Sequence, residues 1–259
     1  MELCHHMYAE ERRQLICDAL DRDGRVTVAE LAERYDVVTE TIRRDLDTLE
    51  SSGLLTRVHG GAIAKRTADP EPDLPTRLST NTAAKKRIAL AASRFLPSGP
   101  LKSVLLDAGS TTLELVGYLS GRNLQVVTNA VGIAQAALMV TTDRLDLLPG
   151  RLRHSTHAAV GVDTVQALSR LHPDVAFIGC NGMSAAGFTT PDVDEAATKT
   201  AMVTQAGRRI VLADSSKAGL VQLVTFAELG EIDVLVTDSG LSDSYTQLFE
   251  DNGIEVVRA

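Results

Sequence analysis

Aromatic residues are scarce in this sequence of 259 residues. It contains no tryptophan, and aromatic side chains make up 3% of the chain. The hydrophobic core must therefore be built mainly from Leu, Val, Ile and Ala. A recognition surface of stacked aromatic rings, as in single-strand nucleic-acid binders, is disfavoured for the same reason.

Cysteines and long apolar runs are also few. Cysteines occur only at positions 4, 17 and 180, an odd number at wide spacing that predicts no disulfide framework. The string Cys4-His5-His6 lacks a second ligand cluster, so a disordered terminus over residues 1–6 is favoured over a metal site. No run of about twenty apolar residues exists, and the N-terminus has no apolar signal segment. We therefore expect a cytoplasmic protein with no membrane contact.

An excess of positive charge is missing as well. The chain has 26 Lys and Arg against 34 Asp and Glu, a formal net charge of −8. A protein that bound nucleic acid through bulk charge would be basic, so any such contact must come from a small local patch. With 44% hydrophobic and 23% charged residues, the composition is that of a globular protein long enough for two domains.

The first 65 residues predict a pair of short helices after a longer one at residues 8–21. Thr27 and Glu30 have the Ser/Thr-x-x-Glu spacing of a capping box, which predicts that a helix starts at Thr27. The next helix, residues 39–50, follows after only a few residues. This arrangement is typical of a helix-turn-helix, whose second helix enters the major groove of DNA.

The helix at 39–50 has one apolar face and one polar face. Its apolar residues recur at a spacing of three and four, which predicts a buried stripe of Ile42, Leu46 and Leu49. Arg43 and Arg44 are left facing outward. Each lies near a carboxylate at helical spacing, so a solvated surface is the alternative to base recognition.

A two-stranded ribbon is predicted after this helix. Residues 54–64 read as two strands that turn at Gly60-Gly61, with Arg57 and His59 on the ribbon. This ribbon has the place and length of a wing. The capped helix, the short turn, the Arg-bearing helix and the wing together favour a DNA-binding domain over residues 1–65.

Residues 66–76 are predicted to be an extended linker, because prolines and acidic residues crowd this stretch. From residue 77 to 259, short apolar runs alternate with helices. That alternation predicts an α/β domain with a mainly parallel sheet covered on both faces. Ligands in such folds bind at the carboxyl ends of the strands.

Polar strings follow several of these expected strands. After the run ending at Leu106 comes Asp107-Ala-Gly109-Ser-Thr-Thr112, then a helix. Such a loop offers backbone N–H groups and hydroxyls that suit a phosphate, although a simple helix cap is an equal alternative. It has neither the Lys of a P-loop nor the G-x-G-x-x-G fingerprint, so no nucleotide cofactor is implied.

Other strand ends contribute further candidates. Thr128 and Asn129 follow one strand, and Lys217 lies after another, where it could supply charge to an anion. Glu195 and Lys199 are one helical turn apart, so they either line the pocket or pair on the surface. Cys180 is interpreted as a small buried residue, because nothing nearby would make it a nucleophile.

Several of these strings resemble the DeoR family of bacterial transcriptional regulators. Thr41-Ile-Arg-Arg-Asp-Leu46 and His59-Gly-Gly-Ala62 resemble its DNA-binding domain. The loop at 107–112, Thr128-Asn129, Glu195-x-x-x-Lys199, the string 213–217 and the spacing of Arg77, Asn81 and Lys85 resemble its effector domain. The sequence departs from the family pattern at two places. Val38 stands where the family usually has Ser, which shifts the expected helix cap to Thr39. Pro149-Gly150 stands where the family has Gly-Gly.

The resemblance implies a winged helix-turn-helix joined to an effector domain similar to the ribose-phosphate isomerase fold, which senses phosphorylated sugars. The implied DNA-binding residues are Thr39, Thr41, Arg43, Arg44, Arg57 and His59. The implied effector-binding residues are Asp107, Gly109, Ser110, Thr111, Thr112, Thr128, Asn129, Glu195 and Lys217.

The expected function is that of a repressor of carbohydrate-catabolism genes, without cofactor, metal or enzymatic activity. Its expected partners are double-stranded operator DNA, a phosphorylated sugar and further copies of itself in a dimer or tetramer. The alternative is a sugar-phosphate isomerase with Glu195 as base and Lys217 as phosphate partner. An N-terminal winged helix weighs against that alternative.

Overall fold

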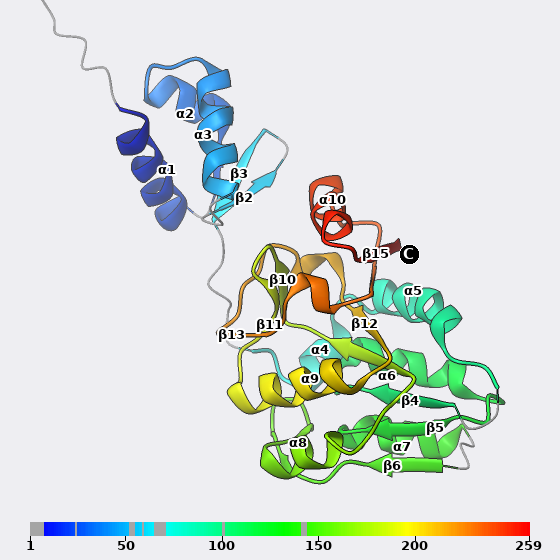
Figure 1. The fold of residues 1–259 in the computed structure, drawn as a ribbon. Coiled ribbons are helices and arrows are strands. Elements are labelled where there is room, and N and C mark those ends of the chain that lie inside the picture. Colours follow the sequence, from blue (N-terminus) through cyan, green and yellow to red (C-terminus); the bar gives the residue numbers. More distant parts are fainter. Residues whose placement is uncertain are drawn as a thin grey trace, which may run out of the picture. The chain divides into compact units, whose positions relative to one another are not determined.

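The computed structural model describes residues 8–23, 25–51, 55–58, 60–64, 71–99, 102–140 and 144–259. The chain divides into two compact units, Met1–Thr67 and Ala68–Ala259 (Figure 1). The terminus expected over residues 1–6 and the wing residue His59 lie outside the described residues. Within the described ranges, no helix is long and apolar enough to cross a membrane.

The first unit is a winged helix-turn-helix, as the sequence predicts. Its helices are α1 (Ala9–Asp23), α2 (Val28–Arg34) and α3 (Thr39–Ser51). Its strands are β1 (Arg25–Thr27), β2 (Leu55–Val58) and β3 (Gly61–Ala64), in the antiparallel order β1-β3-β2. The expected ribbon is confirmed, and β1 adds a third strand that the sequence did not suggest. Ile16, Ile42 and Leu46 are fully buried where the three helices meet.

The capping box expected at the start of α2 is confirmed. Thr27 precedes the helix in an extended conformation, and its hydroxyl oxygen accepts the Glu30 N–H at 3.2 Å. The same hydroxyl donates to the Glu30 carboxylate at 2.8 Å. α3 already includes Thr39 as its first residue, so the cap expected at Thr39 is one residue too late.

The second unit is built on a seven-stranded, fully parallel sheet in the order β15-β14-β12-β9-β4-β5-β6. The strands are β4 (Ser103–Leu106), β5 (Gln125–Thr128), β6 (Arg144–Leu147), β9 (Val175–Gly179), β12 (Arg208–Leu212), β14 (Val234–Thr237) and β15 (Glu255–Arg258). The helices are α4 (Leu74–Ser79), α5 (Thr82–Ala92), α6 (Ser110–Leu115), α7 (Val131–Met139), α8 (Val162–Leu168), α9 (Val193–Gln205) and α10 (Asp243–Asp251). Short 3-10 helices span Ser93–Phe95, Val116–Leu119, Ser215–Lys217 and Leu229–Glu231.

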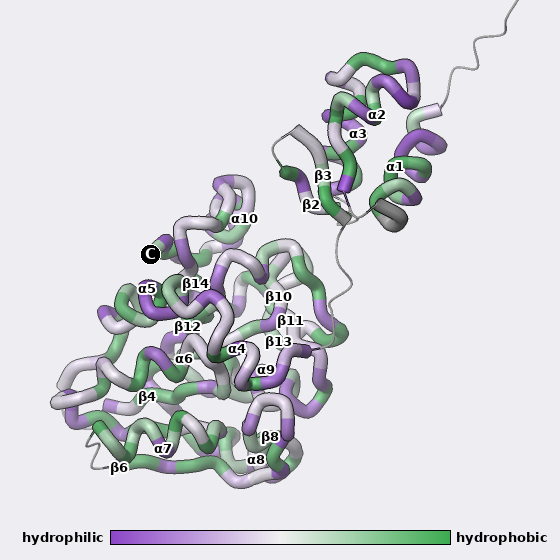
Figure 2. The backbone as a smooth tube through the Cα atoms, turned by 180° about the vertical axis from the view of Figure 1, so that it is seen from behind, coloured by the Kyte–Doolittle hydropathy of each residue, from purple (hydrophilic) through white to green (hydrophobic). Residues whose placement is uncertain are grey.

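Alternate residues along each strand enter two separate cores, which makes the unit a three-layer fold. Leu106 and Phe177 pack with α5, α6 and α7 on one face of the sheet. Leu105 and Ile178 pack with α8, α9 and α10 on the other. The central strands β4, β9 and β14 are buried along most of their length because both faces are covered, as expected for a parallel sheet, whereas the edge strands β6 and β15 have exposed charged residues (Figure 2).

Some smaller elements differ from the sequence prediction. The antiparallel sheet β10 (Gly182–Ser184), β11 (Gly187–Thr190) and β13 (Val224–Ala227) and the hairpin β7 (Arg151–Leu152) and β8 (Ala159–Val160) were not expected in this form. The extended linker expected to reach residue 76 gives way to α4 at Leu74. Asp73 caps that helix by accepting the Thr76 N–H at 3.0 Å, and Pro75 fits its first turn, where no N–H is needed.

Candidate functional site

The outward face of α3 is the candidate recognition surface. Its apolar stripe is buried as predicted, which turns the opposite face to solvent. Thr39, Arg43 and Arg44 are exposed on that face, and Thr41 is half-buried. Four of the residues expected from the sequence therefore lie on one helix at the surface of the first unit.

The two arginines of α3 differ in their partners. The Arg43 guanidinium lies 3.2 Å from the Glu40 carboxylate in a pair that is more than half exposed on both sides. Exposed pairs of this kind are weak, so Arg43 can be released at little cost. Arg44 makes no side-chain hydrogen bond or ion pair to any described residue. Its guanidinium therefore has no competing partner among the described residues.

α3 is fixed to α1 by a buried ion pair that sequence reasoning missed. The Arg12 Nε donates to Asp45 Oδ2 at 2.5 Å, and both residues are 6% exposed. Asp45 follows Arg43 and Arg44 in the sequence and points inward, whereas the two arginines face outward. The ion pair with Arg12 therefore sets the rotation of α3 about its own axis. That rotation determines which side chains face outward.

Arg57 lies at the seam between the wing and α3. Its Nε is 3.2 Å from Asp47 Oδ1, and its backbone N–H donates to the Glu50 carboxylate at 2.8 Å. Its side chain is 25% exposed. The geometry thus gives Arg57, one of the DNA-binding residues that the resemblance implies, partners on α3.

The second unit has a hollow at the point where the strand order reverses. From β4 the chain continues outward through β5 and β6, whereas β9, β12, β14 and β15 extend in the opposite direction. The loops that follow the carboxyl ends of β4 and β9 therefore diverge toward opposite faces of the sheet. In open parallel sheets this is where ligands bind. A hollow of about 80 Å³ lies there, bordered by the loops after β4, β9 and β12.

The hollow brings together groups that are far apart in the chain. The loop residues Gly109, Ser110, Thr111 and Thr112 lie along it together with Lys217, as the sequence suggested. Pro72, Arg77, Thr80, Asn81 and Lys85 contribute from the segment through α4 into α5, and Cys180, Asp214 and Ser216 from the strand ends. Burial raises the pKa of the Cys180 thiol to about 12, which keeps it a neutral, unreactive group.

Three cations and one carboxylate line this hollow. Lys85 is 6% exposed, and its ammonium donates to the backbone carbonyls of Arg77 and Thr80. Burial lowers the pKa of Lys85, and the nearby Arg77 and Lys217 charges lower it further while Asp214 opposes them. Asp214 accepts from Asn81 Nδ2 at 3.0 Å and from Ser216. The balance of charge favours an anionic ligand.

The loop between β4 and α6 has a shape that depends on glycine at position 109. A Cβ at Gly109 would lie 2.8 Å from Thr112 Oγ1, which is itself held by the carbonyls of Asp107 and Gly109. The side chains of Ser110 and Thr111 make no hydrogen bond to a described residue, although both border the hollow. Their hydroxyls are therefore available to a ligand.

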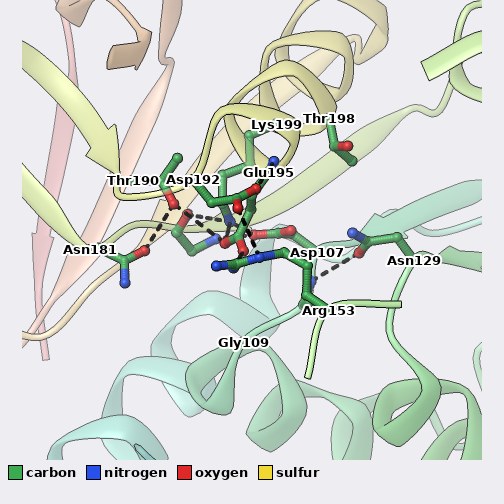
Figure 3. A network of polar contacts seen from close by, with 12 residues as sticks. Asp107, Gly109, Asn129, Arg153, Asn181, Thr190, Asp192, Glu195, Thr198 and Lys199 are labelled. Carbon is green, nitrogen blue, oxygen red and sulfur yellow. Dashed lines mark hydrogen bonds and ion pairs between the residues drawn. The ribbon is translucent and has the colours of Figure 1, made fainter. Parts of the chain in front are cut away.

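A chain of alternating charges starts at Asp107, next to the loop that borders the hollow, and Figure 3 shows its part from Asp107 to Arg153. It passes in order through Asp107, Lys199, Glu195, Arg153 and Glu71. It ends at Arg77, whose Nη1 is 3.6 Å from the Glu71 carboxylate. The interpretation of Glu195 and Lys199 as a surface pair is wrong, because each is 1% exposed.

Mutual pairing favours the charged forms of Lys199 and Glu195 despite their burial, whereas at Asp107 burial prevails and the pKa is raised. Burial opposes the charge on Lys199, but Asp107 and Glu195 outweigh it and raise the pKa of Lys199. Burial likewise opposes the charge on Glu195, yet Lys199 and Arg153 lower the pKa of Glu195. For Asp107, burial raises the pKa, opposed by Lys199 and by the Gly179 N–H, which donates to Oδ2 at 2.9 Å.

Thr128 and Asn129 hold the loop between β4 and α6 in place through hydrogen bonds to its backbone and to the end of β4. Thr128 Oγ1 donates to the Leu106 carbonyl at 2.7 Å, and Asn129 Oδ1 accepts the Ala108 N–H at 3.0 Å. Neither residue borders the hollow, and neither do Asp107 and Glu195. The geometry gives these four residues a positioning role around the loop.

Sequence reasoning left out Glu71, Arg153 and the part that Arg77 and Lys85 play in the hollow. Arg153 lies in an irregular stretch with no recognisable motif, and its partner Glu71 is 82 residues away in the chain. Lys85 and Arg77 could have been found from their spacing before the Ala-rich helix. Their family-like spacing was the one signal present.

Both units match known domain families. Residues 12–68 match the DeoR-like helix-turn-helix domain, and residues 80–239 match the DeoR C-terminal sensor domain. The chain belongs to the DeoR family. The resemblance seen in the sequence is thereby confirmed, and the protein is a DNA-binding transcriptional regulator with a sensor domain.

Curated DeoR-family relatives match over nearly the whole chain. An uncharacterized HTH-type transcriptional regulator of Bacillus subtilis, FruR, is 38% identical, covering 90% of this chain and 92% of its own. The HTH-type transcriptional repressor GlcR of the same organism is 32% identical, covering 97% and 96%. The glycerol-3-phosphate regulon repressor of Escherichia coli is 29% identical, covering 96% and 99%.

A solved structure, eIF2B beta from Chaetomium thermophilum, has a TM-score of 0.46 at 13% identity, covering 66% of this chain and 54% of that one.

Proposed function

We propose that this DeoR-family regulator represses carbohydrate-catabolism genes and leaves its operator when a phosphorylated sugar binds the sensor unit. The observation that carries the proposal is the hollow, where Arg77, Lys85 and Lys217 surround a loop with free hydroxyls. Two relatives are named repressors, and one of them is named for a glycerol-3-phosphate regulon.

A phosphate group fits the donors that border the hollow. It carries close to two negative charges at neutral pH, which the three cations balance against the single carboxylate of Asp214. Ser110 and Thr111 would donate from the loop, next to N–H groups of the first helical turn that have no carbonyl partner within the helix. Asn81 and Ser216 would face the sugar hydroxyls.

The hollow also reaches the segment that follows the linker. Pro72 and Arg77 border it directly, while Glu71 is held by Arg153 Nη2 at 2.9 Å, Ser155 Oγ at 3.2 Å and Asn181 Nδ2 at 3.3 Å. A phosphate that attracts Arg77 competes with Glu71 for that guanidinium. Ligand binding would then alter how the start of the sensor unit is held, and with it the DNA affinity.

The alternative of an isomerase has less support. Glu195, its proposed base, is not among the residues that border the hollow, and it is bonded to Arg153 and Thr190. The lowered pKa of Glu195 makes it a poor proton acceptor. Among the described residues that border the hollow, the only carboxylate is that of Asp214, which is held by Asn81 and Ser216. We therefore propose a regulator without enzymatic activity.

The effector half of the proposal is tested by fluorescence anisotropy on DNA from the protein's own promoter. We expect one member of a panel of sugar phosphates to weaken operator binding at least tenfold, with its unphosphorylated sugar and inorganic phosphate as controls. Lys217→Met should raise the concentration of ligand required about tenfold and leave DNA affinity unchanged. A panel without any active phosphate, or an unphosphorylated sugar with equal effect, contradicts the proposal.

The DNA half is tested by Arg44→Ala, which should weaken specific binding by about 1–3 kcal/mol if Arg44 contacts a base edge. Arg43→Ala should cost a similar amount. Glu40→Gln is the matched control, because it frees Arg43 without removing an arginine. Wild-type affinity in the double variant Arg43→Ala/Arg44→Ala would show that α3 is not the reading helix.

A further inference from the structure

The β6 edge of the sensor sheet, meaning β6 together with the outward face of α7, has an unusual surface. β6 is the last strand of the sheet and pairs only with β5 among the described strands. α7 lies beside it as the helix that connects β5 to β6 (Figure 1). Edge strands with free backbone groups readily pair with another strand.

α7 is uncharged on the side that faces solvent. Its sequence, VGIAQAALM, contains no ionisable residue, and hydrophobic colours dominate it in Figure 2. Val131, Gln135 and Leu138 recur at a spacing of four and three, which places them on one face. Leu138 is 67% exposed and the adjoining Met139 is 83% exposed. A soluble surface helix normally has charges on such a face.

The opposite edge of the same sheet does not share this character. On β15, Glu255 is paired with Arg94 at 3.2 Å and with Arg208 at 3.0 Å. The helix next to it, α10, has acidic residues at Asp243, Glu250 and Asp251. Of the two edges of the sheet, only the β6 edge lies beside a helix without charged residues.

The sequence of β6, Arg144-Leu-Asp-Leu147, is complementary to itself when run antiparallel. When Leu145 of one copy lies opposite Leu145 of the other, Arg144 of each copy lies opposite Asp146 of the other copy. The two-fold axis thus relates two identical Arg144–Asp146 pairs. A shift of one residue would instead place Leu145 opposite a charged Asp146. Opposite charges facing each other stabilise antiparallel pairs, so a single register is favoured.

This register also brings the two α7 helices to packing distance. Strands are about 4.8 Å apart, so a helix above the midline of β5 and β6 lies about 5 Å from the axis. Two such helices are then about 10 Å apart, the usual separation of packed helices. Antiparallel pairing places Leu147 of one copy near the end of α7 that carries Leu138 in the other. Gly132, with open space around its α-carbon, allows close approach.

We infer that the β6 edge binds a second copy of this chain. The two copies form an antiparallel β6–β6 pair centred on Leu145, with α7 packed against α7, so that the two sensor sheets become one continuous sheet.

The inference is tested by charge exchange in the full-length protein, with sedimentation velocity over a concentration series. Wild type should contain at least a dimer. Arg144→Asp and Asp146→Arg should each raise the dimer dissociation constant at least tenfold, because each creates like-charge pairs across the axis. The double variant Arg144→Asp/Asp146→Arg should return to within about threefold of wild type.

Two further variants separate the interface from general effects of charge or misfolding. Glu250→Arg on α10 changes the charge by the same amount as Asp146→Arg and should leave the assembly intact. Leu138→Glu should dissociate the dimer while the circular dichroism spectrum stays that of wild type. A monomeric wild type, or single variants that assemble normally, overturns the inference. Failure of the double variant to recover overturns the register centred on Leu145.

Discussion

The ion pair between Lys199 and Asp107 lies at the buried end of the charge chain. Each residue is 1% exposed, so neither charge can be hydrated. Removing one member of such a pair leaves an uncompensated charge, which costs more than the pair itself contributes. The pair therefore matters less as a source of stability than as a condition for placing the loop that begins at Asp107.

Lys199→Met should lower the free energy of unfolding of the sensor unit by about 3–5 kcal/mol, because it leaves Asp107 buried beside Glu195. The double variant Asp107→Asn/Lys199→Met should recover part of that loss, because no unpaired charge remains at this end of the chain. Urea unfolding of wild type, the single variants Lys199→Met and Asp107→Asn, and the double variant gives the coupling energy. Equal losses in the single and double variants would contradict the account.

Asp238 holds the loop after β12 in place. Its carboxylate accepts the Ser215 N–H at 2.8 Å, the Ser215 hydroxyl at 2.9 Å and the Gly240 N–H at 2.9 Å. Burial alone would raise the pKa of Asp238, but these donors lower it below the ordinary value. This loop continues into Ser216 and Lys217 at the hollow.

Asp238→Asn should lower the free energy of unfolding by about 1–3 kcal/mol at pH 7, through the lost charge-assisted hydrogen bonds. Because the folded pKa lies below the unfolded value, the carboxylate stabilises the fold above about pH 4, and that contribution disappears as the pH falls through the folded pKa. The difference from wild type should thus shrink in acid. Asp243→Asn, at an exposed pair, is the control and should change stability little.

Gly61 lies where β3 crosses against β1. Position 61 pairs with Thr27, and a Cβ there would be 2.1 Å from the Val26 carbonyl oxygen. A Cβ atom and a carbonyl oxygen cannot approach that closely, so any side chain at position 61 would force β1 and β3 apart. The wing therefore depends on glycine at this position.

Gly61→Ala should lower operator affinity at least tenfold and destabilise the first unit, while the sensor unit unfolds as in wild type. Gly117→Ala is the matched change in the sensor unit, where nothing lies near the new methyl group. Differential scanning calorimetry and anisotropy measure the two effects. An unchanged first unit would show that β1 and β3 separate without cost.

Elements with a local signal were predictable from the sequence. The capping box of Thr27 and Glu30 predicts α2, and the spacing of Ile42, Leu46 and Leu49 predicts α3. The start of α4 at Leu74 was missed because Pro75 was interpreted as a breaker, whereas Asp73 makes it a first-turn proline. β1 has three residues and pairs only with a strand far along the chain, so no local pattern could reveal it.

At the scale of the molecule, the loop at 107–112 and Lys217 were predictable from the sequence, but the charge chain that starts at Asp107 was not. Asp107 and Lys199 are 92 residues apart, and their pairing follows from the strand order. Alternation of apolar runs predicts a parallel sheet without telling which strands are neighbours. The reversal between β4 and β9, which creates the hollow, is visible only in the fold.

The position of Glu71 determines where the chain can be cut for expression of the sensor alone. A fragment that starts at residue 77, where the sequence places the domain boundary, would lack the carboxylate that accepts from Arg153, and also the Leu74 N–H that bonds to the Ser155 carbonyl at 2.8 Å. Such a fragment should be less stable and more easily degraded by proteases than one that starts at Ala68. Removal of the residues before position 77 would therefore remove Glu71 and Leu74, which are part of the folded sensor unit.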